Sequence, residues 1–511
     1  MRELKAISGQ VHNNNHRKNC DRSMNRSCDY YDRIKWEFFG ALKKRNLGYK
    51  GDIRSLIGIL TWKFEQDSEN YPVQKRHINA FCEAVTQLKS YKSPDDLISD
   101  FASLKEEWRQ RGPISSYEIF EKPIVDSPVK NITKWHHNGF NFVSLFSGAF
   151  GLDLGFLGAG FNPLIAVDIE ESSEKTLGNN LPDLPFIRED IKKVKTKTIL
   201  EGAGLDVGEL DVVTGGPPCQ PFSTAGKRAG LLDPRASPLT EFIRFVKEAR
   251  PKYFVMEEVT GLLSARLTHV PISERNGRVF SNEEMTGSVF NVIVDMLRST
   301  GYSLSLSNDP SRYKNSILNA ADYGAPQIRN RIIIIGGRDM KPELPSPTHG
   351  ETPFLSFDNW QGRPWNTFWE ATCDLQNKEM ECGKLTPQAR KYLDFVPPGG
   401  NWRDLPKDCV EEAMGKAYTS GGGKMGYFRR LSWDYPCPTV TTAPAQAATM
   451  LCHPEDLRPM SVEEYKRVQG FPDDWQLEGS TATKYLLIGN AVPVHLSYAI
   501  ANQVQNFLNA S

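Results

Sequence analysis

Between residue 140 and about residue 340, short apolar runs rich in β-branched residues alternate with stretches of helical periodicity. The runs are FVSLF, PLIAVDI, DVVTGG, YFVMEEV and RIIIIGG, and FIREDI closes a further short run. Strands that are apolar throughout are typical of a parallel sheet with both faces covered, and the intervening helices supply that cover. The pattern therefore predicts an α/β fold, with a doubly wound, mostly parallel sheet and helices on both faces.

Composition and periodicity divide the rest of the 511-residue chain. We expect six consecutive parts: a disordered polar tail (1–28), a helical module (29–110), a linker (111–139), the sheet-bearing domain (140–340), a smaller irregular domain with short strands (341–450) and a segment that returns to the sheet-bearing domain (451–511). The helical module shows no convincing recognition helix of a DNA-reading helix-turn-helix, so a packing or docking role is favoured.

Composition limits the classes of protein to consider. The 62 basic and 62 acidic residues cancel, so net charge neither indicates nor excludes nucleic-acid binding. The sequence contains no run long and apolar enough for a membrane span and no signal peptide, and nine cysteines without paired spacing favour a cytoplasmic location. The spacings of His12, His16, Cys20 and Cys28 match no zinc arrangement, so no metal site is predicted.

A glycine-bearing turn follows the first predicted strand. Ser147, Gly148 and Gly151 lie between that strand and a helix, the position where doubly wound folds bind nucleotides. Asp168 and Asp190 close the second and third strands, where acids can bind ribose hydroxyls and an adenine amino group. A phosphate-binding Lys-Ser/Thr loop is missing, which favours an adenosine ligand without phosphates over ATP. A plain tight loop is the alternative interpretation.

The stretch TGGPPCQPFST holds one cysteine, Cys219, between prolines and glycines at the end of a predicted strand. Such a rigid setting aims the sulfur at a bound electrophile. Glu257 closes another strand, and Arg329 and Arg331 begin a further one, so all four side chains are expected at strand ends. The alternative interpretations are an inert buried thiol for Cys219, a surface carboxylate for Glu257 and a salt-bridged strand edge for the two arginines.

These motifs resemble, in the same order, those of the C5-cytosine DNA methyltransferases of the bacterial restriction-modification type. FSGAFG resembles the S-adenosylmethionine loop, GGPPCQPFS the catalytic loop, MEEV the glutamate motif and QIRNR the QxRxR motif. RPMSVEEYKRVQGFPDDW and LLIGNAVP resemble the two late motifs. Together they cover 140–505, and the family's variable target-recognition region falls at about 341–450.

The resemblance implies a class I S-adenosylmethionine-dependent methyltransferase fold and a DNA (cytosine-5-)-methyltransferase. The enzyme would transfer a methyl group to C5 of a cytosine flipped out of a specific double-stranded DNA sequence. Cys219 would add to C6 while Glu257 protonates or hydrogen-bonds N3. Arg331 would hold the base O2, and Arg329 would support the pocket. The methylation would protect host DNA.

The resemblance also implies binding residues and partners. For the cofactor S-adenosylmethionine these are Phe146, Ser147, Gly148, Gly151, Asp168, Ile169, Asp190, Ile191, Pro218, Leu239, Asn490 and Val492. For DNA they are Gln220, Ser223, Lys227, Arg228, Arg235, Arg403, Arg429 and Arg430. We expect a monomer, no membrane association, and a companion restriction endonuclease that forms no stable complex with the chain.

The chain departs from the family at Phe150, which replaces a usual glycine, and at Glu258, which replaces a usual asparagine. Because a non-glycine residue does not easily take a positive φ, we expect a different turn or a ring that covers the cofactor. Adjacent strand residues point to opposite faces, so Glu258 is expected to face away from the base.

Two other functions fit parts of the sequence. An RNA methyltransferase would use the same chemistry, but its relatives carry a compact recognition region, whereas about 110 residues are available here. A catalytically inactive methyltransferase fold that only binds DNA is disfavoured by the intact Cys219, Glu257 and Arg331.

Overall fold

The computed structural model describes residues 125–129, 137–218, 237–268, 270, 275–351, 363–376, 378–420, 424–433 and 435–510. The chain divides into Met1–Ser115 and Ser116–Ser511, and all described residues lie in the second part. The predicted tail, helical module and most of the linker therefore lie outside the described residues.

The main sheet confirms the predicted mostly parallel arrangement. Its order is β3-β2-β1-β4-β5-β9-β6, with β7 paired to β9. Strands β1 to β5 pair in parallel, whereas β9 pairs antiparallel with β5, β6 and β7. The strands are β1 (Asn141–Leu145), β2 (Asn162–Asp168), β3 (Phe186–Arg188), β4 (Val212–Gly215), β5 (Tyr253–Val259), β6 (Ser303–Leu304), β7 (Ile317–Asn319) and β9 (Asn330–Gly337). The strand order reverses between β1 and β4, which is where such folds place their ligand crevice.

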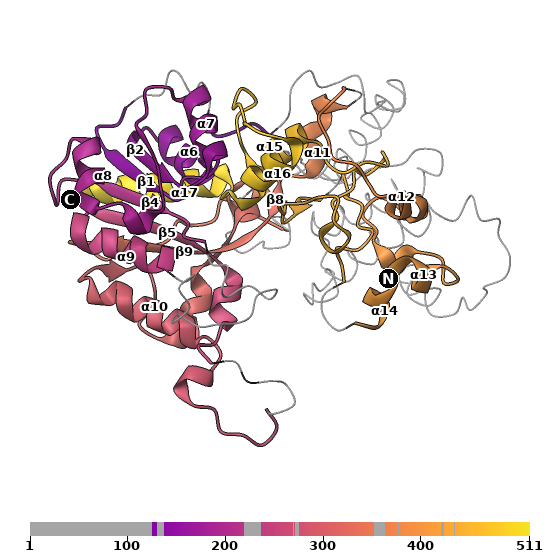
Figure 1. Ribbon diagram of the computed structural model, residues 1–511, viewed down its shortest axis with the longest axis horizontal. Helices are drawn as coiled ribbons and strands as arrows, with labels where there is room; N and C mark the ends of the chain where they lie inside the picture. The colour runs from indigo at the N-terminus through magenta and orange to yellow at the C-terminus, as the bar shows by residue number, and fades with distance from the viewer. Residues whose placement is uncertain are drawn as a thin grey trace, which may run out of the picture. The chain divides into compact units, whose positions relative to one another are not determined.

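Helices cover both faces of this sheet, as predicted (Figure 1). They are α6 (Gly151–Gly158), α7 (Glu171–Asn180), α8 (Thr196–Ala203), α9 (Ser237–Ala249), α10 (Ser288–Ser299) and α17 (Val494–Ala510). Successive strand residues point to opposite faces, so Phe142 packs with α6 and α17 while Val143 packs with α8 and α9. Both side chains are fully buried.

The C-terminal helix α17 lies against the first helix, α6. A Cβ atom at Gly155 would lie 2.3 Å from the Ser497 hydroxyl oxygen, so only glycine permits this close approach. The Ser497 hydroxyl also donates a hydrogen bond to the Leu152 carbonyl. The last segment of the chain therefore completes the core that the first motif begins.

The described part of residues 341–450 forms short elements. Tyr392 and Met414 belong to a separate apolar cluster, whereas Phe368 and Cys437 belong to the core that packs on the main sheet. The region contains the two-residue strands β10 (His349–Gly350), which pairs with β11 (Arg363–Pro364), and β12 (Cys437–Pro438), which pairs with β8 (Gln327–Ile328). The region also holds helices α11 (Phe368–Thr372), α12 (Pro387–Leu393), α13 (Val410–Met414) and α14 (Lys416–Thr419). Helices α15 (Val462–Gln469) and α16 (Thr481–Asn490) follow. Among the described residues, we find no helix long and apolar enough to cross a membrane.

Candidate active site

The turn between β1 and α6 bends the chain back toward the end of β2. Phe146, Gly148 and Phe150 all have positive φ, at 57°, 50° and 71°. This bend directs the Gly148 N–H to the Asp168 carboxylate, which accepts it at 2.8 Å. Burial raises the pKa of the Asp168 carboxyl. The sequence-predicted turn and acid are therefore brought together.

The other predicted cofactor residues differ in exposure. Ile169 is 61% exposed although it is apolar, and the Asp190 carboxylate accepts the Lys192 N–H at 3.1 Å. Pro218 and Asn490 are exposed, whereas Ser147, Ile191, Leu239 and Val492 are buried. Phe146, Ile169, Asp190 and Pro218 all follow the carboxyl ends of β1 to β4, so they share one edge of the sheet.

Gly151 joins this turn to the last sequence motif. A Cβ atom at Gly151 would lie 2.6 Å from the Val492 carbonyl oxygen and 2.8 Å from the Ala491 Cβ. Residues 151 and 492 are far apart in sequence, and only a glycine lets their backbones approach this closely.

Phe150 contradicts both expectations drawn from its sequence. It adopts the left-handed conformation (φ 71°, ψ 21°) that we expected a non-glycine residue to avoid. Its ring does not cover the cofactor edge but is fully buried, stacked on Trp475 with centroids 6.2 Å apart. Burial of the ring in the core compensates for the unfavourable backbone conformation.

A buried acid beneath the turn was missed from the sequence. The Asp153 carboxylate accepts hydrogen bonds from the Ser144 hydroxyl at 2.7 Å and the Thr214 hydroxyl at 2.5 Å. Burial raises the pKa of Asp153 to about 7. The Ser144 hydroxyl also lies 2.9 Å from that of Ser147, which accepts the Val167 N–H. A polar residue inside the apolar helix GLDLGFLG was the available signal.

Glu257 and Arg331 form an ion pair, with 2.6 Å between Oε1 and Nε and each side chain 12% exposed. The register explains the contact: Arg331 pairs with Val259 across the antiparallel β5–β9 ladder, and Glu257 lies two residues before Val259 on the same face. Glu258 is buried, as adjacent strand residues alternate in direction. Sequence reasoning placed both members of the pair at strand ends, and the structure joins them.

The end of β4 leads toward the predicted nucleophile. A Cβ atom at Gly216 would lie 2.8 Å from the Glu257 carboxylate, so the glycine leaves room for that acid. Pro218 is the last described residue of this segment. Cys219 lies outside the described residues, as do the predicted DNA contacts Gln220, Ser223, Lys227, Arg228 and Arg235.

Arg329 is buried and links separate segments. Its guanidinium donates to the Val440 carbonyl at 2.8 Å and the Gly489 carbonyl at 2.7 Å. Burial and the neighbouring positive charge of Arg331 lower its pKa. It braces the strand that carries Arg331.

The three predicted DNA contacts in the described part of 341–450 have different surroundings. Arg403 is exposed, with its guanidinium 5.7 Å from the centroid of the Trp402 ring. Arg429 is half-buried, and its Nε donates to the Met450 carbonyl at 3.0 Å.

Arg430 requires a correction, because its side chain is an internal brace. It is 8% exposed and donates to the carbonyls of Val396, His453 and Glu455. A guanidinium committed to three carbonyls does not face a phosphate, so we remove Arg430 from the candidate DNA contacts.

Comparisons with known proteins identify the same family as the sequence motifs. The profile of the C-5 cytosine-specific DNA methylase family matches residues 140–506. Type II methyltransferase M.Eco47II of Escherichia coli is 36% identical over 415 residues, covering 78% of this chain and 89% of that protein. M.Sau96I of Staphylococcus aureus is 33% identical over 476 residues, covering 92% and 97%. M.PspPI of Psychrobacter is 33% identical over 432 residues, covering 80% and 93%.

The profile match spans both the turn at β1 and the Glu257–Arg331 pair, and the first of these relatives exceeds one-third identity over most of its length. The chain therefore belongs to the C-5 cytosine-specific DNA methylase family and is a DNA cytosine-5-methyltransferase of the restriction-modification type.

Proposed function

We propose that the chain transfers the methyl group of S-adenosylmethionine to C5 of a cytosine flipped out of a specific double-stranded DNA sequence. The Glu257–Arg331 ion pair carries this proposal. It joins an acid and a fixed cation at the ends of β5 and β9, next to the Gly216 loop that leads to Cys219. Such a pair suits the N3 and O2 atoms of a pyrimidine.

The edge of the sheet fits S-adenosylmethionine and the class I methyltransferase fold. The Asp168 carboxylate is held by the β1 turn at a position suited to ribose hydroxyls, and exposed Ile169 beside it offers an apolar surface to adenine. Asp190 lies at the end of the neighbouring strand. The bound cofactor supplies an electrophilic methyl group.

The protein's groups then act on the base. The Cys219 thiolate forms a bond to C6 while Glu257 donates a hydrogen bond or a proton to N3, which raises the electron density at C5. Arg331 orients Glu257 and faces O2. After C5 has received the methyl group, loss of the C5 proton to a base restores the ring double bond and expels the Cys219 sulfur.

Bisulfite sequencing of DNA from cells that express each variant tests the proposal. Cys219→Ser is expected to abolish methylation, and Glu257→Gln to reduce it by about a hundredfold or more. Cys409→Ser is the matched control, because the Cys409 thiol donates to the Pro406 carbonyl and a serine hydroxyl can make the same bond. Undiminished methylation by Cys219→Ser would contradict the covalent mechanism.

The class of nucleic acid is tested separately. Purified enzyme and labelled S-adenosylmethionine are incubated with unmethylated duplex DNA or with transfer RNA. Label in DNA alone supports the proposal, and label in transfer RNA alone contradicts it. The companion endonuclease, the monomeric state and the cytoplasmic location stay predictions from the sequence.

A further inference from the structure

Two buried glutamines join the strand that leads to Arg331 to the last sequence motif. Gln327 lies in β8 and Gln469 ends α15, and both side chains are fully buried. The Gln469 amide nitrogen donates to the carbonyls of Ile488 and Ala491, at 2.6 and 2.9 Å. Its oxygen accepts from the Gln327 nitrogen at 2.7 Å.

The hydrogen-bond pattern permits one orientation of each amide. The Gln327 oxygen accepts the Val440 N–H at 2.9 Å, so the Gln327 nitrogen must face Gln469. A flipped Gln469 amide would place its oxygen against two carbonyl oxygens and its nitrogen against the nitrogen of Gln327. The hydrogen bond between the two side chains therefore fixes the orientation of both amide groups.

The turn that Gln469 supports, residues 488–492, consists of the last three residues of α16 and the two residues that follow, and it packs on Gly151 next to the proposed cofactor edge. The Val492 carbonyl and the Ala491 side chain pack on Gly151 with no room for a methyl group. On the other side of the turn, Gly489 packs as closely on the Thr441 carbonyl. The Gly489 carbonyl also accepts a hydrogen bond from the Arg329 guanidinium. A shift of this turn would displace the α6 end of the β1 turn.

We propose that Gln469 is a positioning residue that fixes the 488–492 turn against the cofactor loop, and that Gln327 holds Gln469 in the orientation this requires. The inference rests on the proposed cofactor site. Both glutamine side chains are fully buried, so they act through the turn. Loss of the Gln469 amide removes a donor from both carbonyls. The Ile488 carbonyl keeps the Ala491 N–H at 3.1 Å, whereas the Ala491 carbonyl loses the side-chain donor that ties it to α15, so the turn is no longer fixed there.

The test measures binding of S-adenosylhomocysteine by calorimetry to the full-length parent and to Gln469→Met and Gln469→Glu. Methionine keeps the volume without the donors, whereas glutamate keeps the shape but faces two carbonyls with oxygen. Both variants are expected to bind on the order of tenfold more weakly than the parent. The exposed Gln476→Met is the matched control and is expected to bind like the parent.

If Gln469 only stabilised the fold, its loss would weaken the binding of S-adenosylhomocysteine and of DNA alike. Affinity for unmethylated duplex DNA without cofactor is expected to stay within about twofold, and KM for S-adenosylmethionine to rise more than kcat falls. Affinity for S-adenosylhomocysteine that stays within about twofold of the parent in a folded Gln469 variant overturns the inference.

Gln327→Met keeps the inference testable if both Gln469 variants fail to fold. It leaves both Gln469 donors in place but removes the support of the Gln469 oxygen, together with the acceptor of the Val440 N–H, so a smaller loss of about threefold is expected, and unchanged affinity overturns the inference. A parent protein that does not bind S-adenosylhomocysteine contradicts the proposed function instead, so the two failures are distinguishable.

Discussion

Phe150 shows how one residue can combine an unfavourable backbone with favourable packing. Phe150→Gly removes about 1–2 kcal/mol of left-handed strain but loses a buried ring that is worth about 3–5 kcal/mol. We expect a net loss of about 2 kcal/mol, measured by urea unfolding. Phe150→Ala is expected to be less stable still, since it loses the ring and keeps the strain. A glycine variant as stable as the parent would contradict this balance.

Asp153 is the residue whose titration bears most directly on stability. Burial raises its folded pKa to about 7, above the unfolded value of about 3.9, so the unfolded state ionises first as pH rises. Its contribution to stability is complete below about pH 4 and is lost as pH rises toward 7. We therefore expect the difference in unfolding free energy between Asp153→Asn and the parent to shift by roughly 2 kcal/mol in favour of Asp153→Asn as pH rises from 5 to 7.

Urea unfolding of the parent and Asp153→Asn at several pH values measures this difference. Comparison of the two proteins cancels the titration of the other carboxyl groups. A stability difference that does not change with pH would show that Asp153 titrates like an exposed carboxyl.

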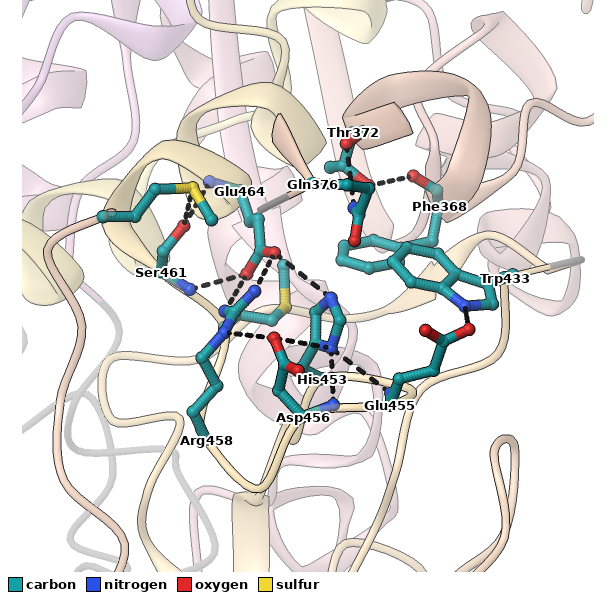
Figure 2. Close-up of polar contacts among 12 residues, drawn as sticks. Phe368, Thr372, Gln376, Trp433, His453, Glu455, Asp456, Arg458, Ser461 and Glu464 are labelled. Carbon is teal, nitrogen blue, oxygen red and sulfur yellow. Dashed lines mark hydrogen bonds and ion pairs between the residues drawn. The ribbon is translucent and has the colours of Figure 1, made fainter. Parts of the chain in front are cut away.

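At the scale of elements, the start of α15 is anchored by a buried ion pair (Figure 2). Arg458 donates two hydrogen bonds of 2.8 Å to Glu464, which is fully buried and also accepts the Ser461 N–H. Beside it, His453 accepts the backbone N–H groups of Glu455 and Asp456, and burial lowers its pKa. This cluster directs the chain from residues 341–450 into α15.

Breaking this pair is expected to destabilise the protein. Glu464→Gln removes the buried carboxylate of the pair and leaves Arg458 with only the exposed Asp456 carboxylate, at a cost of about 2 kcal/mol because Arg458 is itself partly exposed to solvent. The matched control is Glu412→Gln, which breaks the exposed Lys391–Glu412 pair and is expected to cost less than about 1 kcal/mol. Thermal unfolding compares the two, and equal losses would contradict the importance of burial.

At the scale of the whole molecule, the sheet order gives one ligand crevice, and the chain segments that meet there come from distant parts of the sequence. Binding of a ligand to the folded state alone stabilises it by about 2.7 kcal/mol at a hundredfold excess over its Kd. We expect S-adenosylhomocysteine to raise Tm by about 2 °C, measured by scanning calorimetry. ATP at the same concentration is expected to give no shift, and an equal shift would contradict an adenosine site without phosphate contacts.

Much of the sheet and part of the site were predictable because their signals are local. Apolar runs predicted β1, β2, β4, β5 and β9, and strand ends predicted where Glu257 and Arg331 lie. Residues 341–450 were harder to predict, because the helices described there, α11 to α14, have too few turns to show a periodicity. Arg430 was predicted to contact DNA because the sequence alone does not show whether an arginine side chain is exposed or buried.

The sequence by itself determined the parallel sheet, the order of the motifs and hence the family, since each depends on neighbouring residues and on spacing along the chain. Only the tertiary structure decided that Phe150 turns its ring into the core, that Asp153 is buried under the turn between β1 and α6, and that Gln327 meets Gln469. The physical reason is that burial and hydrogen-bond partners depend on residues distant in sequence, which only the packed fold brings together.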